Sequence, residues 1–222
     1  MNLFAIAMLA SAAPAVPVPP MGPQILTNEE EVYFDREAGR TSAPWIGMRI
    51  ELDGGTTFVD AFGKVVPAVR NEGSVISADK TGIVVTLAGG RKTALRRARP
   101  VTCWASIKKD TPKADGSEDW YFVKDVHLHD QGGRALVGDG VPGVKPVVLR
   151  LRDVTWTGSA RSSNRPSLVL YIHTPDQPDH AVSYVWADPG AARLGVNLRW
   201  MQASCTIDGL ERGATGSETK AN

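Results

Sequence analysis

Short apolar runs in which every second residue is apolar recur from Trp45 onward, and this period is the feature that most constrains the fold. The runs are rich in β-branched side chains, and glycine-rich turns separate them. Turns at this density are typical of antiparallel β-meanders, sandwiches and small barrels. No apolar stripe with a period of 3.6 residues extends beyond about ten residues. The pattern predicts an all-β fold, either an antiparallel sandwich or a barrel.

The runs fall into two groups on either side of Arg99. Shorter strands are expected before it, at residues 45–52, 56–59, 64–69, 73–77 and 81–87. Longer strands are expected after it, at residues 101–108, 119–129, 144–153, 167–173, 181–187 and 194–207. The sequence therefore predicts a small β unit over 27–99 and a larger one over 100–207, with one continuous sandwich as the alternative. Residues 208–222 carry few apolar side chains and are expected to form a flexible tail.

A short helix is expected at the start of the first unit, over residues 27–37. Thr27 and Glu30 have the spacing of a capping box, and acidic residues fill the first turn that this box would open. The preceding residues, 13–26, are rich in proline and predict an extended spacer.

The first twelve residues have the pattern of a secretory signal peptide. An apolar run ends at Ala10, and Ala10 and Ala12 give the small-x-small spacing that signal peptidase cleaves. The run is too short to cross a bilayer as a helix, which takes roughly 20 apolar residues. The first basic residue is only Arg36, so the positively charged start of a typical signal is missing. We expect export to the periplasm or medium of a bacterium, without a transmembrane segment; the alternative is an apolar N-terminus on a cytosolic protein.

Cys103 and Cys205 are the only two cysteines, so one intramolecular pairing exists. Both lie in predicted strands, and in an oxidising compartment they are expected to form a disulfide. Such a bridge would close a loop of roughly a hundred residues, which corresponds to about 2–5 kcal/mol of stabilisation. Two buried free thiols are the alternative if the protein stays in the cytosol.

The overall composition argues against nucleic acid as a partner. Lys and Arg number 25 against 24 Asp and Glu, so no basic excess is present, while a hydrophobic fraction of 42% is sufficient for a packed core. Residues 138–143 match the letters of a dinucleotide-binding glycine motif, but they lie between two predicted strands instead of opening a helix. The sequence also has no nucleophile elbow. No cofactor is therefore expected.

A His-x-His pair is the strongest candidate for chemistry. On a regular strand His127 and His129 project from one face, side by side, and could bind Zn²⁺ or Cu²⁺. Tyr121 and Val123 would share that face. His173 and His180 flank a predicted hairpin loop and would complete a four-ligand site if that loop reached the pair. The alternative is that the histidines only cover the solvent side of the sheet.

Two further features could contact a ligand. A group of five cations could form an anion-binding patch, or could simply be a solvated strand edge; its members are Arg91, Lys92, Arg96, Arg97 and Arg99. Trp156 lies in a polar loop and could stack on a sugar ring, whereas the tryptophans in predicted strands are expected to be buried or half-buried.

These features favour a non-catalytic, exported β domain that binds or scaffolds at the cell envelope, with an envelope glycan or protein as the partner. Two alternatives remain open at this level. One is a metal-dependent enzyme, such as a hydrolase, that uses His127 and His129. The other is a carbohydrate-binding module that uses Trp156.

Overall fold

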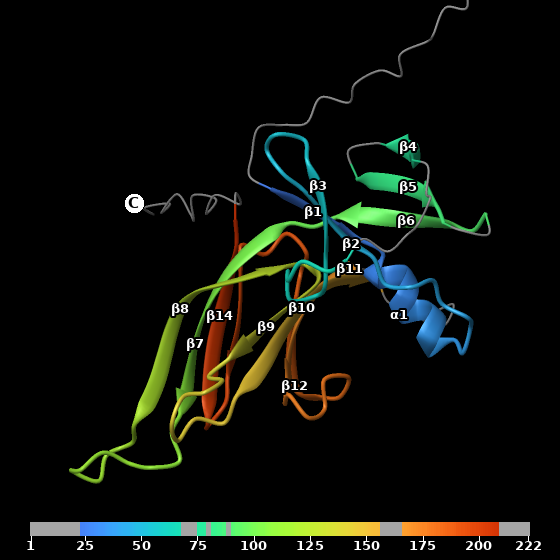
Figure 1. The fold of residues 1–222 in the computed structure, drawn as a ribbon. Helices are drawn as coiled ribbons and strands as arrows, with labels where there is room; N and C mark the ends of the chain where they lie inside the picture. Colours follow the sequence, from blue (N-terminus) through green and yellow to red (C-terminus); the bar gives the residue numbers. More distant parts are fainter. Residues whose placement is uncertain (1–22, 68–74, 79–80, 88–89, 156–165, 209–222) are drawn as a thin grey trace, which may run out of the picture.

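The computed structural model describes residues 23–67, 75–78, 81–87, 90–155 and 166–208 (Figure 1). Within these ranges the chain forms fourteen β-strands and one short helix, and the paired strands run antiparallel. The strands make three open sheets. The predicted all-β class is confirmed, in its sandwich form.

Six strands of the N-terminal half form one sheet. In spatial order they are β3 (Thr56–Val59), β2 (Gly47–Ile50), β1 (Gln24–Thr27), β6 (Lys92–Arg97), β5 (Gly82–Thr86) and β4 (Val75–Ala78). Leu26 on β1 and Leu95 on β6 are buried in its small core. Because β1 lies in the middle of the sheet, the predicted proline-rich spacer cannot extend to residue 26. Residues 1–22, which include the predicted signal peptide, lie outside the described part of the chain.

The predicted helix is present as α1 (Glu29–Glu37), but it begins two residues late and lacks the capping box. Thr27 belongs to β1, and the N-cap residue is Asn28, whose side chain makes no capping bond. Asn28 instead accepts a hydrogen bond from the Ile46 backbone NH at 2.7 Å and donates one to the Pro44 carbonyl at 2.9 Å. These bonds join the start of the helix to the segment that enters β2.

Two differences from the expected strands occur in this half. The basic run contains β6, because Thr93 and Leu95 alternate with the cations and are buried. The strand expected over 64–69 is not found in its described part, residues 64–67, where Val65 makes only an isolated bridge to Val59.

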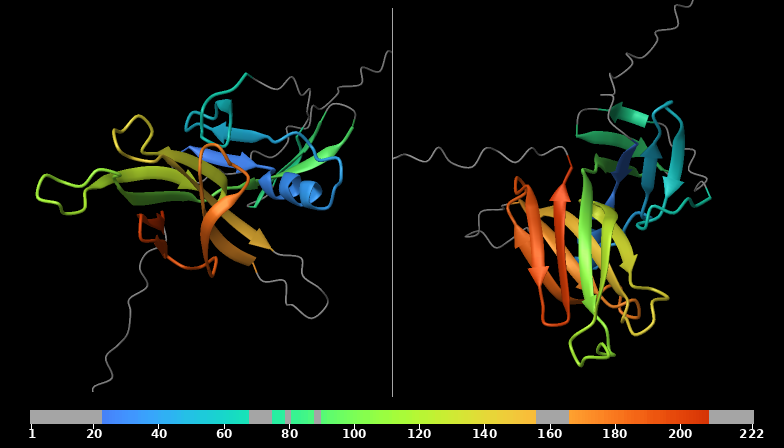
Figure 2. Two further views of the ribbon diagram at one scale, coloured as in Figure 1. Left: turned by 90° about the horizontal axis from the view of Figure 1, so that it is seen from below. Right: turned by 90° about the vertical axis from the view of Figure 1, so that its left-hand side faces the viewer.

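The C-terminal half is a sandwich of two four-stranded sheets (Figure 2). One has the order β12 (Ala181–Ala187), β11 (Pro166–His173), β10 (Val147–Thr155) and β9 (Gln131–Val137). The other has the order β13 (Arg193–Asn197), β14 (Met201–Ile207), β7 (Pro100–Lys108) and β8 (Trp120–His129). The buried core between them includes Ile107, Leu149, Leu151, Leu170, Ile172 and Met201.

Cys103 and Cys205 are joined by a disulfide in this core. They lie directly opposite each other on the adjacent strands β7 and β14. The predicted bridge and the predicted adjacency of the two cysteine strands are both confirmed.

Strand β8 does not keep one face along its length. Its register with β7 shifts between the pairs Val123–Ala105 and Val126–Cys103, and Asp125 in this bulge has a φ of 55°. The bulge reverses the alternation, as an extra residue in one strand must. Tyr121 and Val123 therefore pack against the core before the bulge, while His127 is exposed after it. The expectation that they share a face with His127 is wrong.

Two other strands differ from the prediction. Strand β9 occupies a segment for which no strand is predicted, because Gly132 and Gly133 resemble a turn. The single strand expected over 194–207 is a hairpin of β13 and β14, closed by a hydrogen bond from the Leu198 NH to the Met201 carbonyl at 2.7 Å.

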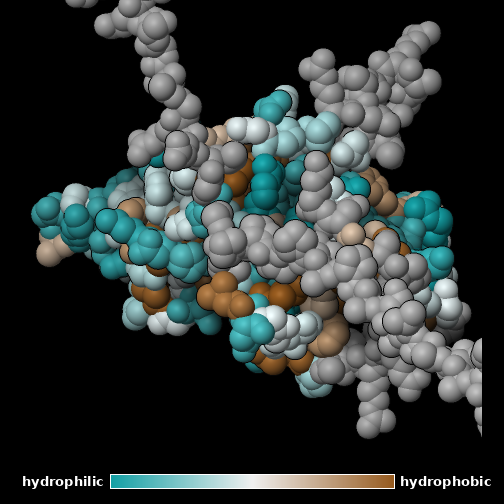
Figure 3. All heavy atoms as spheres, turned by 90° about the horizontal axis from the view of Figure 1, so that it is seen from above, coloured by the Kyte–Doolittle hydropathy of each residue, from teal (hydrophilic) through white to brown (hydrophobic). Residues whose placement is uncertain are grey.

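The six-stranded sheet lies at one end of the sandwich, and α1 lies beside the β12–β9 sheet (Figures 1 and 2). Seen from that end, the described surface is mainly hydrophilic with hydrophobic patches between (Figure 3). The contacts of α1 with this sheet create the site described next.

Candidate functional site

One face of the β12–β9 sheet is turned away from the sandwich core, and we call it the outer face. Leu149 and Leu151 of β10 point into the core, so Arg150 and Arg152, which alternate with them, point outward. The same alternation places Tyr171 on the outer face of β11 and Trp186 on that of β12. The outer face therefore carries arginines and aromatic rings in place of small polar residues.

Strand register aligns these side chains in rows across the sheet. Arg134, Arg150, Tyr171 and Tyr184 are successive cross-strand partners from β9 to β12. The next row contains Arg152, Val169 and Trp186. In the row on the other side of the Arg150–Tyr171 pair, His173 lies opposite Val148. Directly opposed side chains on one face are close neighbours, so the two arginines of the first row repel each other unless they are neutralised.

Helix α1 covers part of the outer face through Glu29. Its carboxylate pairs with Arg150 and, at 3.6 Å, with Arg152, and it accepts a hydrogen bond from the Trp45 indole NH at 2.9 Å. The guanidinium carbon of Arg152 lies over the aromatic ring of Tyr33, 3.6 Å from the centroid of that ring. Arg152 is only 2% exposed, so this end of the face is desolvated.

Gly132 on β9 is what lets Glu29 approach the sheet. A Cβ at this position would lie 2.5 Å from the Glu29 Cγ, and the φ of Gly132 is +81°. Both the close approach and the left-handed conformation require glycine. The Gly132–Gly133 pair made β9 look like a turn in the sequence, and its first residue, Gly132, leaves the space that the Glu29 side chain occupies.

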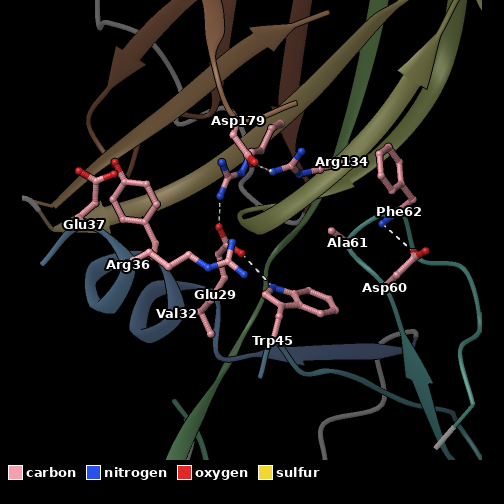
Figure 4. Close-up of a pocket in the computed structure, with 12 residues that line it drawn as sticks. Glu29, Val32, Arg36, Glu37, Trp45, Asp60, Ala61, Phe62, Arg134 and Asp179 are labelled. Carbon is pink, nitrogen blue, oxygen red and sulfur yellow. Dashed lines mark hydrogen bonds and ion pairs between the residues drawn. The ribbon is translucent and has the colours of Figure 1, made fainter. Parts of the chain in front are cut away.

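A pocket of about 500 Å³ opens where α1, β9 and the turn after β3 meet, and we call it the arginine pocket (Figure 4). Arg134 and Arg150 line it from the sheet, and Trp45 and Phe62 supply apolar walls. In Figure 4 Arg36 extends from α1 toward Glu29, and Arg134 lies with Asp179 on the opposite side. The turn after β3 is held against β9 by a hydrogen bond from the backbone NH of Arg134 to the backbone carbonyl of Ala61 at 2.8 Å.

The side chain of Arg134 is 14% exposed and only weakly neutralised. It donates to the Pro178 carbonyl at 3.0 Å and lies 3.5 Å from Asp179, whose carboxylate is 76% exposed. Burial lowers the pKa of Arg134, and the positive charge of Arg150 lowers it further. The protein therefore holds two like charges side by side in a desolvated place.

The Nε of Arg150 is a buried donor on the outer face that makes no hydrogen bond. Unpaired buried donors are uncommon in folded proteins, and each calls for an explanation such as local strain or a bound water or ion. The Tyr171 hydroxyl interacts with Arg152, and the His173 ring interacts with the His180 backbone. Burial lowers the pKa of His173 to about 4, and Arg134 and Arg150 act in the same direction, so its ring is neutral near pH 7. Burial also raises the pKa of Tyr171.

A second pocket, of about 520 Å³, lies on the β11–β12 side of the same face, and we call it the aromatic pocket. It is lined by Ser167, Val169, Tyr171, Tyr184 and Trp186. Tyr184 is 63% exposed and Trp186 is 68% exposed, although both are held on a strand. The expectation that Trp186 is buried or half-buried because it lies in a strand is wrong, since β12 turns it outward at the edge of the sheet.

The predicted metal pair is not brought together with other ligands. His127 is exposed, whereas His129 is buried and its ring Cδ2 lies 2.8 Å from where a side chain on Gly133 would begin. Burial lowers the pKa of His129 to about 4. The described ranges contain no group of three or more His, Cys, Asp or Glu side chains that could hold a metal ion. His173 is buried, whereas His180 at the end of the loop that follows is exposed.

The predicted cation patch is divided among internal partners. Arg91 pairs with Glu31 and Asp35, Arg96 pairs with Glu30, Arg97 donates to Gln24, and Arg99 contacts Asp130, Asp153 and the Pro189 carbonyl. Lys92 is exposed. Arg99 ties the β6–β7 link to the sandwich, and burial raises the pKa of its partner Asp130 despite the arginine. Each of the four arginines therefore has a partner among the described residues, while Arg91 and Arg96 also remain partly open to solvent.

Three remaining expectations concern single segments. Trp156 lies outside the described residues. Residues 138–143 connect β9 to β10, as expected for a link between strands. The part of the chain that the structure describes contains no helix long and apolar enough to cross a membrane.

The outer face was missed at the level of sequence because its members come from four separate strands and one helix. The only local signal is the alternation of arginine with leucine in β10, which is unusual for a strand in the middle of a sheet. No protein-family model matches the chain, and no curated protein or solved structure matches it either.

Proposed function

We propose that this protein is an exported, non-catalytic β domain that binds a glycan of the cell envelope through the aromatic pocket. The observation that carries the proposal is the exposure of Tyr184 and Trp186 on a paired strand, beside the half-buried ring of Tyr171. Rings of this kind offer a flat apolar surface, with polar edges, to which a sugar ring can stack. A binding site on a strand is also rigid, which lowers the entropic cost of binding.

The lining of the aromatic pocket supports binding without catalysis. Its five described residues supply hydroxyl and apolar groups but no carboxylate, thiol or imidazole. Imidazole and carboxylate groups supply most general acid–base chemistry, so the two tyrosine hydroxyls are the acid–base groups that the described lining offers.

Two observations support export. The disulfide between Cys103 and Cys205 is of the kind that persists in oxidising compartments. The apolar run that ends at Ala10 has the length and cleavage pattern of a signal peptide. Intact-mass measurement of the protein recovered from the periplasm or the medium should give a chain that begins near Ala13. Recovery of the full-length chain from the cytosol alone would refute export.

Glycan binding can be tested by titrating the purified protein with a panel of envelope polysaccharides in a calorimeter, which does not depend on the tryptophans that are replaced. We expect Trp186→Ala and Tyr184→Ala to weaken binding about tenfold or more, since large aromatic anchors dominate binding energy. Trp104→Ala is the matched control, because Trp104 is also partly exposed but lies on the opposite sheet. Equal binding by all variants would refute the proposal.

The second candidate function is binding of a protein partner, and the observation that favours it is the edge of β12 that is unpaired among the described strands. Edge strands can pair with another chain, and β12 carries the exposed Val182 beside its two rings. Light scattering separates the two candidates: a dimer that Trp186→Ala converts to a monomer favours the protein partner.

A further inference from the structure

We infer that the arginine pocket binds an anionic group, a carboxylate, phosphate or sulfate, that belongs to the same glycan. This inference rests on the proposed function, because it names the class of glycan that the outer face selects. It predicts an acidic polysaccharide as the ligand.

The first argument is the charge at the floor of the arginine pocket. Arg134 and Arg150 line the pocket from neighbouring strands, and Arg152 lies two residues beyond Arg150, outside the pocket lining. Glu29 is the buried carboxylate that pairs with Arg150 and Arg152. Glu29 is shared between Arg150 and Arg152, which leaves Arg134 with the solvated Asp179. Desolvated charge of one sign costs free energy that an anion of the ligand would offset.

The acidic residues of the pocket do not cancel this charge, because they lie at the rim. Asp60 uses its Oδ1 to accept hydrogen bonds from the backbone NH groups of Phe62 and Lys64, both at 2.9 Å. Glu37 and Asp179 are exposed. Carboxylates that are hydrated or engaged in a turn interact weakly with the buried guanidinium groups.

The second argument is independent of charge and concerns an unused donor. The Nε of Arg150 is buried and makes no hydrogen bond. Arg150 is nine-tenths buried and lines the arginine pocket. An oxyanion would accept hydrogen bonds from guanidinium groups, which match carboxylate and phosphate oxygens in shape as well as charge.

The third argument is distance along the outer face. Arg134 and Tyr184 end the same row and are three strand spacings apart, about 14 Å at roughly 4.8 Å per strand. A chain of a few sugar rings spans this distance. One glycan can therefore stack on Tyr184 and Trp186 while an acidic substituent reaches Arg134 and Arg150.

The test compares acidic polymers with neutral versions of the same chains. Polygalacturonate, alginate and hyaluronate are each titrated by calorimetry, next to carboxyl-reduced forms in which the carboxylate has become an alcohol. A phosphate-bearing mannan and a sulfated glycan distinguish the sources of the anion. We expect at least one acidic polymer to bind about tenfold or more tightly than its neutral form, and the difference to shrink when salt rises from about 50 mM to about 500 mM.

Arg134→Gln is the informative variant, since it removes a guanidinium and also relieves the repulsion with Arg150, so that folding is preserved. We expect it to bind the acidic polymer as weakly as the neutral one. Arg193→Gln on the exposed face of β13 makes the same charge change elsewhere and should bind like the wild type.

The outcomes separate this inference from the proposed function. Equal binding of acidic and neutral forms, lost in Trp186→Ala and unchanged in Arg134→Gln, overturns the anionic group and leaves glycan binding standing. Binding of galacturonate or inorganic phosphate that depends on Arg134 but not on Trp186, with no polymer bound, refutes glycan binding and leaves an anion site. Binding of none of these probes overturns both.

Discussion

Replacing Glu29 with glutamine should destabilise the protein strongly, because this carboxylate neutralises two buried arginines. The side chains of Arg150 and Arg152 are 11% and 2% exposed, and both pair with Glu29. Removing one partner of a buried ion pair leaves an uncompensated charge, which costs about 3–5 kcal/mol. Since each kcal/mol shifts the midpoint by about 2–4 °C in a chain of this size, the loss corresponds to roughly 6–20 °C.

Thermal unfolding followed by circular dichroism measures this shift. Glu37→Gln is the matched control, because it makes the same chemical change at the exposed end of the same helix, where substitutions change stability by about 0.5 kcal/mol or less. A Glu29→Gln midpoint within a degree or two of the control would refute the argument that Glu29 neutralises the outer face. Failure of Glu29→Gln to fold, when Glu37→Gln folds, would agree with it.

Three further outcomes are expected. Replacing Cys103 and Cys205 with alanine should lower the free energy of unfolding by about 2–5 kcal/mol, measured by urea titration, and a loss below about 1 kcal/mol would contradict a stabilising bridge. The free energy of unfolding should fall as the pH drops from 6.5 toward about 4, because His173 binds a proton in the unfolded chain but stays neutral when buried in the folded protein. His173→Gln should make the free energy of unfolding less dependent on pH in this range. An unchanged pH dependence would count against the role of His173. Elemental analysis of untagged protein should find no stoichiometric zinc, copper or iron, whereas metal that is lost in a His127→Ala/His129→Ala variant would restore the metal-enzyme hypothesis.

Local pattern was enough to predict the class of the fold and its one covalent link. The two-residue period sets which side chains can share a face, and turns rich in glycine limit where strands can end. Cys103 and Cys205 could be paired because no other cysteine competes. The short helix was also predictable, although tertiary bonds of Asn28 moved its start.

Elements that depend on their neighbours could not be predicted from local pattern. Strand β9 contains Gly132 and Gly133, which in the sequence look like a turn. The structure shows that Gly132 is needed for a different reason, the close approach of the Glu29 side chain. The bulge at Asp125 changed the face on which His127 lies, and the local sequence around Asp125 gave no signal for a bulge. The basic run became strand β6 with its flanking residues, and Arg91, Arg96 and Arg99 in it pair with α1 and the sandwich.

The outer face shows most clearly what only tertiary structure decides. Sequence placed Arg150 and Tyr171 in strands, but it could not say that they lie opposite each other or that α1 would cover one end of their row. Alternation is a property of adjacent residues and is visible in any short window. Register, by contrast, pairs residues far apart in the chain and is set by the packing of the whole sheet, so a site assembled across four strands exists only once the fold is complete.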